Sequence, residues 1–262
     1  MKRYYNCETN CLIYCSSNAD QFFWDTQWQQ QQQKFPEVCR PSWLVSLTKK
    51  YLPLGSRVLE GGCGLGLHVR GLHKYGFLPV GIDYASNTIS ILNKKFPELQ
   101  FLLGDIRSLP FSSNSFAGYW SIGVIEHFWG GYSGILAEAH RVLQANGYFF
   151  LTFPVMSPLR RLKARFGLYD SYTSEHEPDS FYQFALYPFD VIGTVEAQGF
   201  SLVNSLRYDA FKGFKDELTF VRPALQLIYS NQSFFCRVLR YAVNILFSGF
   251  AGHSQILIFR KI

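Results

Sequence analysis

The chain has 262 residues, of which 48% are hydrophobic and only 17% charged, a composition typical of a folded globular protein and not of a disordered one. Its length suffices for one large α/β domain with insertions. The net charge of +6 is spread along the chain apart from a basic cluster at 160–165. A charge balance this mild does not predict a nucleic-acid partner.

The first 54 residues are predicted to form an arm and covering helices ahead of the main domain. Residues 1–17 are expected to be irregular, whereas 18–35 and about 41–51 have helical patterns. The start of the chain lacks the clean apolar stretch of a secretory signal, and no apolar run reaches the roughly 18 residues that indicate a spanning helix. A cytoplasmic location is therefore expected.

Three cysteines lie close together in the N-terminal segment. Cys7, Cys11 and Cys15 follow a CxxxCxxxC spacing, which departs from the spacings of iron–sulfur ligands. In a reducing compartment such residues are more often free thiols. We therefore expect no metal site in this chain.

From residue 57 to 153, short apolar segments alternate with helical patterns. The predicted strands are 57–61, 78–82, 99–103, 116–121 and 147–153, and the predicted helices are 66–75, 86–96 and 132–144. This alternation is typical of a doubly wound, mostly parallel sheet with helices on both faces. A helix at about 188–198 and strands at 200–208 and 253–261 return to this core, which leaves 155–187 and 211–250 as insertions.

The segment 58–66, VLEGGCGLG, places an acid and a series of glycines between a predicted strand and a predicted helix. Glycine has no Cβ, so the backbone can turn sharply and a ligand can approach it closely. The helix that follows begins with unpaired N–H groups and the positive end of its dipole. This strand–glycine–helix context is the one that a nucleotide site requires.

Acidic residues also end the next two strands. Asp83 follows Gly62 by about 20 residues, the distance expected for a ribose-binding acid in a βαβ unit. Asp105 comes just after the strand at 99–103. Because the carboxyl ends of parallel strands share one edge of a sheet, Glu60, Asp83 and Asp105 are expected to gather where α/β proteins bind ligands.

The sequence resembles the class I S-adenosylmethionine-dependent methyltransferases, in particular their small-molecule type 11 branch. Four segments carry the resemblance in the family's order and spacing: VLEGGCGLG (58–66), VGIDYA (80–85), LLGDIRSLPFSSNSFAGYWSIGVIEHF (102–128) and ANGYFFLTFP (145–154). The resemblance implies a Rossmann-like, seven-stranded sheet of order 3-2-1-4-5-7-6 with an antiparallel last strand. It places a methyltransferase domain at 55–262, with its two insertions as lids over the substrate.

The resemblance also assigns site residues. Glu60 would receive the methionine ammonium group of S-adenosyl-L-methionine, Asp83 both ribose hydroxyls, and Asp105 the adenine amino group. The other expected cofactor contacts are Gly62, Cys63, Gly64, Gly66, Tyr84, Ile106, Ser121 and Ile122. Glu126 and His127 follow the fourth strand, beside the expected entry of the methyl acceptor. His127 is either a general base, since histidine exchanges protons near neutral pH, or a residue that holds the loop by hydrogen bonds.

We therefore expect methyl transfer by direct displacement to a small-molecule or lipid-like acceptor, with S-adenosyl-L-homocysteine as the other product. The aromatic share of 18%, with Trp24, Trp28 and Phe128 in segments that could cover the site, favours an acceptor with apolar bulk. One alternative is an NAD(P)-dependent oxidoreductase, although its GxGxxG fingerprint differs from the GxGxG found here. Another is a non-catalytic methyltransferase-like domain that binds the cofactor or a partner.

The segment 234–250 is predicted to be an amphipathic helix with a basic edge, formed by Arg237 and Arg240. Three roles fit such a helix: a lid, a dimer contact, or a peripheral membrane contact. The sequence leaves these roles, and the oligomeric state, open.

Overall fold

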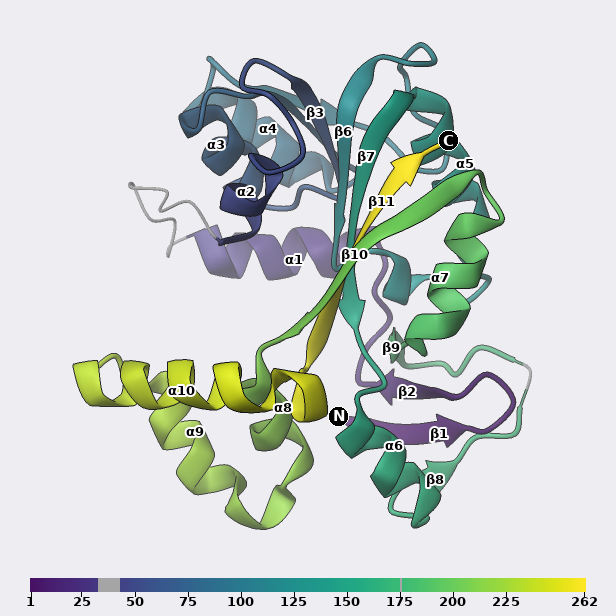
Figure 1. The fold of residues 1–262 in the computed structure, drawn as a ribbon, viewed down its shortest axis with the longest axis vertical. Coiled ribbons are helices and arrows are strands. Elements are labelled where there is room, and N and C mark those ends of the chain that lie inside the picture. The colour runs from purple at the N-terminus through teal and green to yellow at the C-terminus, as the bar shows by residue number, and fades with distance from the viewer. Residues whose placement is uncertain (33–42, 175) are drawn as a thin grey trace.

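The computed structural model describes residues 1–32, 43–174 and 176–262, and it contains two sheets (Figure 1). The strands of the larger sheet, from edge to edge, are β5 (Gln100–Leu103), β4 (Leu78–Asp83), β3 (Arg57–Gly61), β6 (Phe116–Ile122), β7 (Leu143–Pro154), β11 (Ser254–Lys261) and β10 (Phe200–Tyr208). Strands β3 to β7 pair in parallel, whereas β11 runs antiparallel to both its neighbours. The predicted order 3-2-1-4-5-7-6 is confirmed.

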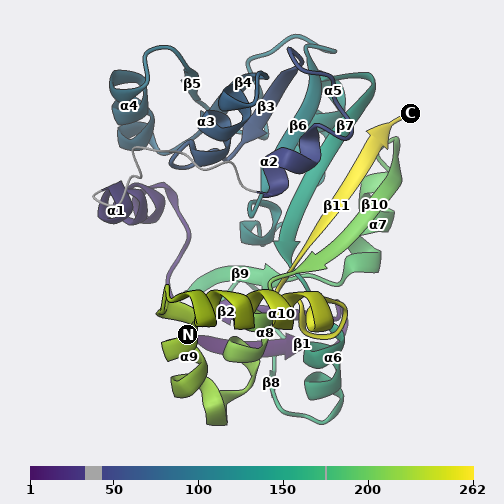
Figure 2. The ribbon, with the colours of Figure 1, turned by 60° about the vertical axis from the view of Figure 1, so that its left-hand side comes forward.

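Helices cover both faces of the larger sheet (Figures 1 and 2). One face carries α2 (Trp43–Thr48), α3 (Leu67–Lys74) and α4 (Ser86–Lys95), and the other carries α5 (Ser133–Val142) and α7 (Pro188–Glu196). Successive strand residues point to opposite faces, so each strand contributes side chains to a hydrophobic core on either face of the sheet. Coverage on both faces explains why strands such as β7 are apolar almost throughout.

The smaller sheet was not predicted. Its strands, in order, are β8 (Asp170–Ser171), β1 (Lys2–Asn6), β2 (Cys11–Cys15) and β9 (Phe181–Ala185). The expectation of an irregular arm over 1–17 is therefore wrong, because β1 and β2 form an antiparallel hairpin and every residue of β2 is buried. Cys11 and Cys15 lie in β2 as buried thiols.

Helix α1 (Gln21–Gln32) lies beyond the carboxyl ends of the parallel strands. It confirms the helix predicted for 18–35 as far as Gln32. Residues 33–35 of that prediction, and 41–42 of the next, lie outside the described residues. The Asp25 carboxylate of α1 accepts hydrogen bonds from the N–H and hydroxyl of Thr88, both at 3.2 Å. The first turn of α4 is thus capped by another helix and not by its own Ser86.

The second insertion is helical. It forms α8 (Ala210–Glu217), the 3-10 turn η2 (Thr219–Val221), α9 (Arg222–Ser230) and α10 (Phe234–Ala251). Helix α10 has 18 residues and a mean hydropathy of 1.3, so by length and composition alone it could cross a membrane. The expectation that no segment reaches this length was wrong, because two arginines inside the helix obscure the apolar run.

A buried ionic cluster ties β1 to both insertions. Glu217 of α8 accepts hydrogen bonds from Arg3 of β1, from Arg160 and Lys163 of α6 (Pro158–Arg165), and from the Tyr169 hydroxyl, at 2.9, 2.9, 2.9 and 2.6 Å respectively. Burial alone would raise the pKa of Glu217, but the cations overcome it and hold the pKa at about 2. Part of the basic cluster seen in the sequence is therefore internal.

Candidate active site

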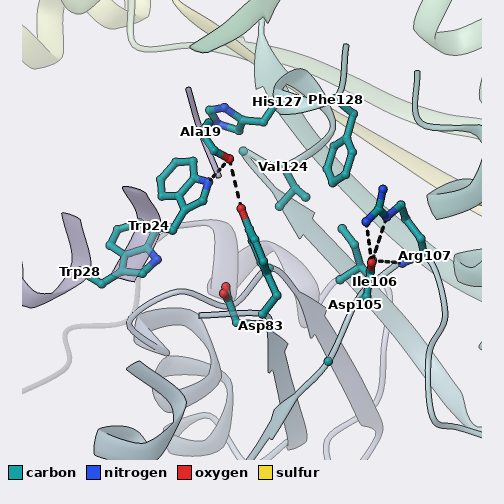
Figure 3. A pocket seen from close by; sticks show the side chains of 14 residues that line it. Ala19, Trp24, Trp28, Asp83, Asp105, Ile106, Arg107, Val124, His127 and Phe128 are labelled. Carbon is teal, nitrogen blue, oxygen red and sulfur yellow. Dashed lines mark hydrogen bonds and ion pairs between the residues drawn. The ribbon is translucent and has the colours of Figure 1, made fainter. Parts of the chain in front are cut away.

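A pocket of about 210 Å³ opens at the carboxyl ends of β3, β4, β5 and β6, against α1 (Figure 3). This is the edge where open α/β sheets bind ligands. The lining residues are Ala19, Trp24, Trp28, Gly62, Asp83, Tyr84, Gly104, Asp105, Ile106, Arg107, Gly123, Val124, His127 and Phe128. Six of the residues predicted for the site are among them: Gly62, Asp83, Tyr84, Asp105, Ile106 and His127.

The glycine loop forms one wall with its backbone. Gly62 and Gly64 have φ angles of 73° and 47°, in the left-handed region that side chains disfavour. A Cβ on Gly62 would lie 2.6 Å from a methyl carbon of Val124, and one on Gly64 would lie 3.0 Å from the indole of Trp28. Glycine is therefore needed both for the turn and for the close approach of neighbouring side chains.

Asp83 ends β4 inside the pocket. Its Oδ2 accepts the N–H of Gly64 at 2.8 Å, and its Oδ1 accepts the N–H of Ala85 at 2.9 Å. Burial raises the pKa of Asp83, and these two N–H donors oppose that shift. Each carboxylate oxygen can accept a second hydrogen bond, so Asp83 can brace the glycine loop and still receive a pair of hydroxyls.

Asp105 forms an ion pair with Arg107. The Arg107 guanidinium donates to Asp105 at 2.7 to 3.1 Å through Nη2 and Nε, and this pairing lowers the pKa of Asp105. Ile106 lies between them and gives the pocket an apolar surface (Figure 3). Arg107 was not among the predicted site residues. Its position two residues after Asp105, in the GDIRS turn, was the available signal.

Several predicted contacts are not among the residues that line the pocket: Glu60, Cys63, Gly64, Gly66, Ser121, Ile122 and Glu126. Glu60 is buried, and its carboxylate accepts the N–H of Val69 in α3 at 3.2 Å. That burial raises the pKa of Glu60 well above its usual range. The Ser121 hydroxyl is also buried and has no hydrogen-bond partner among the described residues. Contact of these residues with a cofactor stays a prediction.

Helix α1 covers the pocket with two tryptophans. Trp24 and Trp28 stack with their ring centres 5.2 Å apart. The Trp24 indole N–H and the Tyr84 hydroxyl both donate to the Ala19 carbonyl, at 3.1 and 3.2 Å (Figure 3). The insertions 155–187 and 211–250, expected to be lids, supply none of the described residues that line the pocket. The cover comes from the N-terminal segment instead.

His127 lies in the 3-10 turn η1 (Ile125–His127) that follows β6, and its ring meets Trp24 edge-on at 4.9 Å. Its Nδ1 lies 2.6 Å from the carbonyl oxygen of Tyr182. A carbonyl only accepts hydrogen bonds, so Nδ1 carries the proton and Nε2 is left as an acceptor. Burial lowers the pKa of His127 to about 4, which keeps the ring neutral at physiological pH.

Glu126 is not among the residues that line the pocket. Its side chain is buried, and Oε2 has no hydrogen-bond partner in the described part of the chain. Burial raises the pKa of Glu126 to about 8, so it is a neutral acid near pH 7. The side chain lies close behind Gly123, where a Cβ would be 3.5 Å from Oε1. Glu126 therefore belongs to the support of the pocket wall.

Comparison with known proteins gives a partial match. Residues 59–151 match the methyltransferase domain family. A protein of Mycolicibacterium smegmatis named "Probable S-adenosylmethionine-dependent methyltransferase" is 29% identical over 100 residues, or 38% of each chain. The phthiotriol/phenolphthiotriol dimycocerosates methyltransferase 1 of Mycobacterium ulcerans is 32% identical over 102 residues, or 37% of each chain. The match thus spans little more than a third of these relatives.

The fold similarity extends further along the chain. The solved structure of the cyclase SpnF aligns with a TM-score of 0.59 at 18% identity, covering 95% of this chain and 98% of that one. At this identity the likeness shows the fold alone. Three observations nevertheless support the same kind of fold: the matched domain, the confirmed strand order, and the position of the pocket at the ligand-binding edge of the sheet. Residues 59–151 are therefore similar to the methyltransferase domain family, and the sheet that holds them has the strand order expected for the class I S-adenosylmethionine-dependent methyltransferases.

Proposed function

We propose that this chain binds S-adenosyl-L-methionine in the pocket beneath α1 and transfers its methyl group to a small-molecule or lipid-like acceptor. The observation that carries the proposal is the division of the pocket. Asp83 and Asp105 lie at one end, and His127, Phe128 and Trp24 lie at the other (Figure 3). A polar nucleoside and an apolar acceptor would each find suitable chemistry in the same cavity.

The residues present fit this cofactor. Asp83 would accept the two ribose hydroxyls, and Gly62 would let the ligand approach the backbone, where a Cβ would have no room. Asp105 would accept from the adenine amino group while keeping its bond to Arg107, and Ile106 would contact the ring. The buried hydroxyl of Ser121, which has no hydrogen-bond partner in the described part of the chain, lies near the end of β6, two residues before the pocket-lining Gly123.

The bound cofactor supplies a methyl group activated by its positively charged sulfur. The protein then has to hold an acceptor in line with that group and keep water away. Correct positioning by itself can contribute about 7–11 kcal/mol to lowering a barrier. In our proposal Trp24 and Trp28 exclude water from above, and Nε2 of His127 accepts a hydrogen bond from the attacking group and so orients it.

Two observations support a lipid-like acceptor. The names of the relatives that act on phthiotriol and phenolphthiotriol dimycocerosates support a lipid-like acceptor. The aromatic lining of the pocket supports the same class. The fold by itself does not decide the reaction, because a protein named as a cyclase shares it.

Two measurements test the proposal in sequence. Calorimetry with S-adenosyl-L-homocysteine and with NAD asks which nucleotide binds, and we expect only the former. Transfer of labelled methyl groups from S-adenosyl-L-methionine is then followed in a lipid extract and in an aqueous metabolite extract, and we expect labelled product in the lipid extract. NAD binding would overturn the cofactor assignment. Cofactor binding without transfer to either extract would favour a non-catalytic domain.

The Asp83→Ala variant should bind S-adenosyl-L-homocysteine at least about tenfold more weakly than the wild type. Loss of charge-assisted hydrogen bonds costs about 1.5–3 kcal/mol, and the variant also removes the acceptor that braces Gly64. Calorimetry measures the affinity, and circular dichroism checks the fold. Asp179→Ala, in an exposed loop, is the matched control. Unchanged affinity in a folded Asp83→Ala variant would rule out ribose binding by this residue.

The His127→Ala variant should turn over about a hundredfold more slowly, in the range typical for loss of a proton-accepting group, while its affinity for S-adenosyl-L-homocysteine stays within about threefold. Because the pKa of His127 is about 4, the residue stays neutral and should add no pH dependence to the rate above about pH 5. Initial rates between pH 5 and pH 7, below the pKa of Glu126, check both points. A loss smaller than fivefold would leave His127 with only its structural bond to Tyr182.

A further inference from the structure

The exposed side of α10 carries apolar residues, which is the reverse of an ordinary amphipathic helix on a protein surface. Along α10, Phe234, Val238, Tyr241 and Ile245 recur every three or four residues, so they share one side of the helix. All four are exposed, Phe234 to 83% and Tyr241 to 69%. In a water-exposed helix this side would carry the polar residues.

Three polar side chains of α10, those of Arg240, Asn244 and Ser248, form hydrogen bonds within the protein, whereas Arg237 is exposed. The Arg240 guanidinium donates to backbone carbonyls at the end of α9, including that of Ile228 at 2.6 Å. The Asn244 side chain accepts the N–H of Phe211 in α8 at 2.9 Å. Ser248 bonds to the backbone of α10 itself. The bonds of Arg240 and Asn244 therefore hold the helix on α8 and α9, and the apolar side is left uncovered by the described residues.

The exposed apolar surface is larger than α10 alone. Phe220 in η2 is exposed to 96% and Leu227 in α9 to 73%, and Phe235 and Leu246 of α10 are exposed to 75% and 72%. We call the exposed side chains Phe220, Leu227, Phe234, Phe235, Tyr241 and Leu246 the outer patch. Figures 1 and 2 both show α9 and α10 at one end of the molecule, with α1 between them and α4. Apolar patches of this kind mark protein or membrane contacts.

The charge around the outer patch indicates the chemistry of its partner. From Leu218 to Ile262 the sequence contains no Asp or Glu, whereas Arg222 and Arg237 are exposed on α9 and α10. A surface that combines exposed aromatic and aliphatic residues with cations fits the headgroup region of an anionic membrane. In a symmetric dimer the same patch would meet itself, which would bring these arginines together with no acid from this segment to pair them.

The connection to the sheet favours a helix that lies on the membrane. Tyr208 at the end of β10 pairs with Ser254 at the start of β11, so the insertion leaves and rejoins the sheet at one point. A crossing by α10 would need a second crossing to return, and α9 has nine residues where about 20 are required. Arg240 would also sit near the middle of the crossing.

We propose that the outer patch docks this protein on the surface of anionic lipid bilayers, with α9 and α10 lying in the headgroup region. The proposal does not depend on methyl transfer. It would place the pocket close to lipid-like molecules that are poorly soluble in water. Because the test uses neither cofactor nor acceptor, its failure would leave the proposed function unaffected.

Co-sedimentation with vesicles tests the proposal on the full chain. We expect the protein to bind vesicles of equal parts phosphatidylcholine and phosphatidylglycerol, to bind phosphatidylcholine alone much more weakly, and to be released by high salt, which screens surface charges. Hydrogen exchange should slow across 218–250 when the anionic vesicles are added. Absence of binding to the anionic vesicles at physiological salt would overturn the proposal.

Two pairs of substitutions locate the contact. Arg222→Glu with Arg237→Glu should lower the partition coefficient at least about 25-fold, since each basic residue near an anionic surface contributes about fivefold. Phe234→Gln with Leu246→Gln should lower it at least about tenfold by removing buried apolar area. Lys50→Glu with Lys94→Glu, and Leu54→Gln with Phe189→Gln, are matched exposed controls elsewhere on the molecule and should change it less than about twofold.

Other occupants of the outer patch give different results. A dimer in equilibrium sedimentation that Phe234→Gln with Leu246→Gln dissociates, without vesicle binding by the wild type, would assign the patch to a second copy. Vesicle-bound protein that resists alkaline carbonate would indicate insertion across the bilayer. Equal loss of binding in the test and control pairs would indicate nonspecific charge attraction. Each of these outcomes overturns the proposal.

Discussion

Replacing Glu217 by alanine is expected to lower the free energy of unfolding by about 3–5 kcal/mol, the cost typical of removing one partner from a buried ion pair. The variant would leave Arg160, which is fully buried, and Lys163 without their carboxylate. Arg3 of β1 would lose its partner as well. Urea denaturation at pH 7 measures the loss. Glu98→Ala, at an exposed position, should change stability by less than about 0.5 kcal/mol.

The pH dependence of this effect follows from the lowered pKa of Glu217. A carboxylate whose folded-state pKa lies near 2 stabilises the protein fully above its ordinary value near 4.5, and that stabilisation is lost as the pH falls toward 2. The difference between wild type and Glu217→Ala should therefore be constant from pH 5 to pH 8 and shrink below pH 4. A difference that keeps its size at pH 3 would contradict the assignment of charge to Glu217.

A double variant separates charge pairing from packing. Glu217→Ala combined with Arg160→Met removes both a buried anion and a buried cation, so its cost should be smaller than the sum of the two single costs. The residual loss comes from the backbone carbonyls of Val155 and His253, which Arg160 satisfies in the wild type. Additive costs would mean that the two side chains act independently.

The core of the fold could be predicted because its signals are local. Strand β3 follows from the apolar run that ends at Glu60, and its bounds agree with the predicted 57–61. Helix α5 follows from apolar residues at helical spacing over 132–144. The positions of Asp83 and Asp105 in the pocket follow from the rule that parallel strands end at one edge. Each of these inferences needs only a short segment.

The smaller sheet could not be predicted in the same way, because its strands depend on distant partners. Strand β2 pairs with β1 but also with β9, about 170 residues further along the chain. The two-residue strand β8 carries no pattern of its own. The CLIYC segment is apolar throughout, as expected for a strand covered on both faces. The segments that cover it are distant in the sequence, so this pattern alone did not indicate a strand.

Side-chain partners outside the segment explain the remaining differences. The periodicity of α10 revealed two unlike sides, yet the sequence could not show that Arg240 and Asn244 face the protein. The carboxylate that caps α4 belongs to Asp25 in α1, a residue that gave no signal in the sequence. Arg107 pairs with Asp105 inside the predicted site. In each case a distant or unexpected contact decides which way a side chain points.

Replacing Glu126 by glutamine is expected to make the protein more stable than the wild type above pH 8. The folded protein holds the Glu126 proton up to about pH 8, whereas the unfolded chain releases it near the ordinary value of 4.5. A raised pKa of this kind stabilises the folded state below 4.5, and that contribution is lost as the pH rises through 8. At about 1.4 kcal/mol for each pKa unit, the shift corresponds to about 3–5 kcal/mol.

Urea denaturation of both proteins at pH 5, 7 and 9 measures this difference. The stability of Glu126→Gln relative to wild type should rise with pH and level off above pH 8, since glutamine keeps the shape of the side chain and cannot ionise. Glu98→Gln is the exposed control and should follow the wild type at every pH. Parallel curves for Glu126→Gln and wild type would show that Glu126 is ionised, and therefore partnered or hydrated, in the folded protein. Turnover should also change near pH 8, because Glu126 precedes His127 in η1 and a Cβ on the pocket-lining Gly123 would lie 3.5 Å from its Oε1. Wild-type activity should fall above pH 8, and the Glu126→Gln variant should keep its activity.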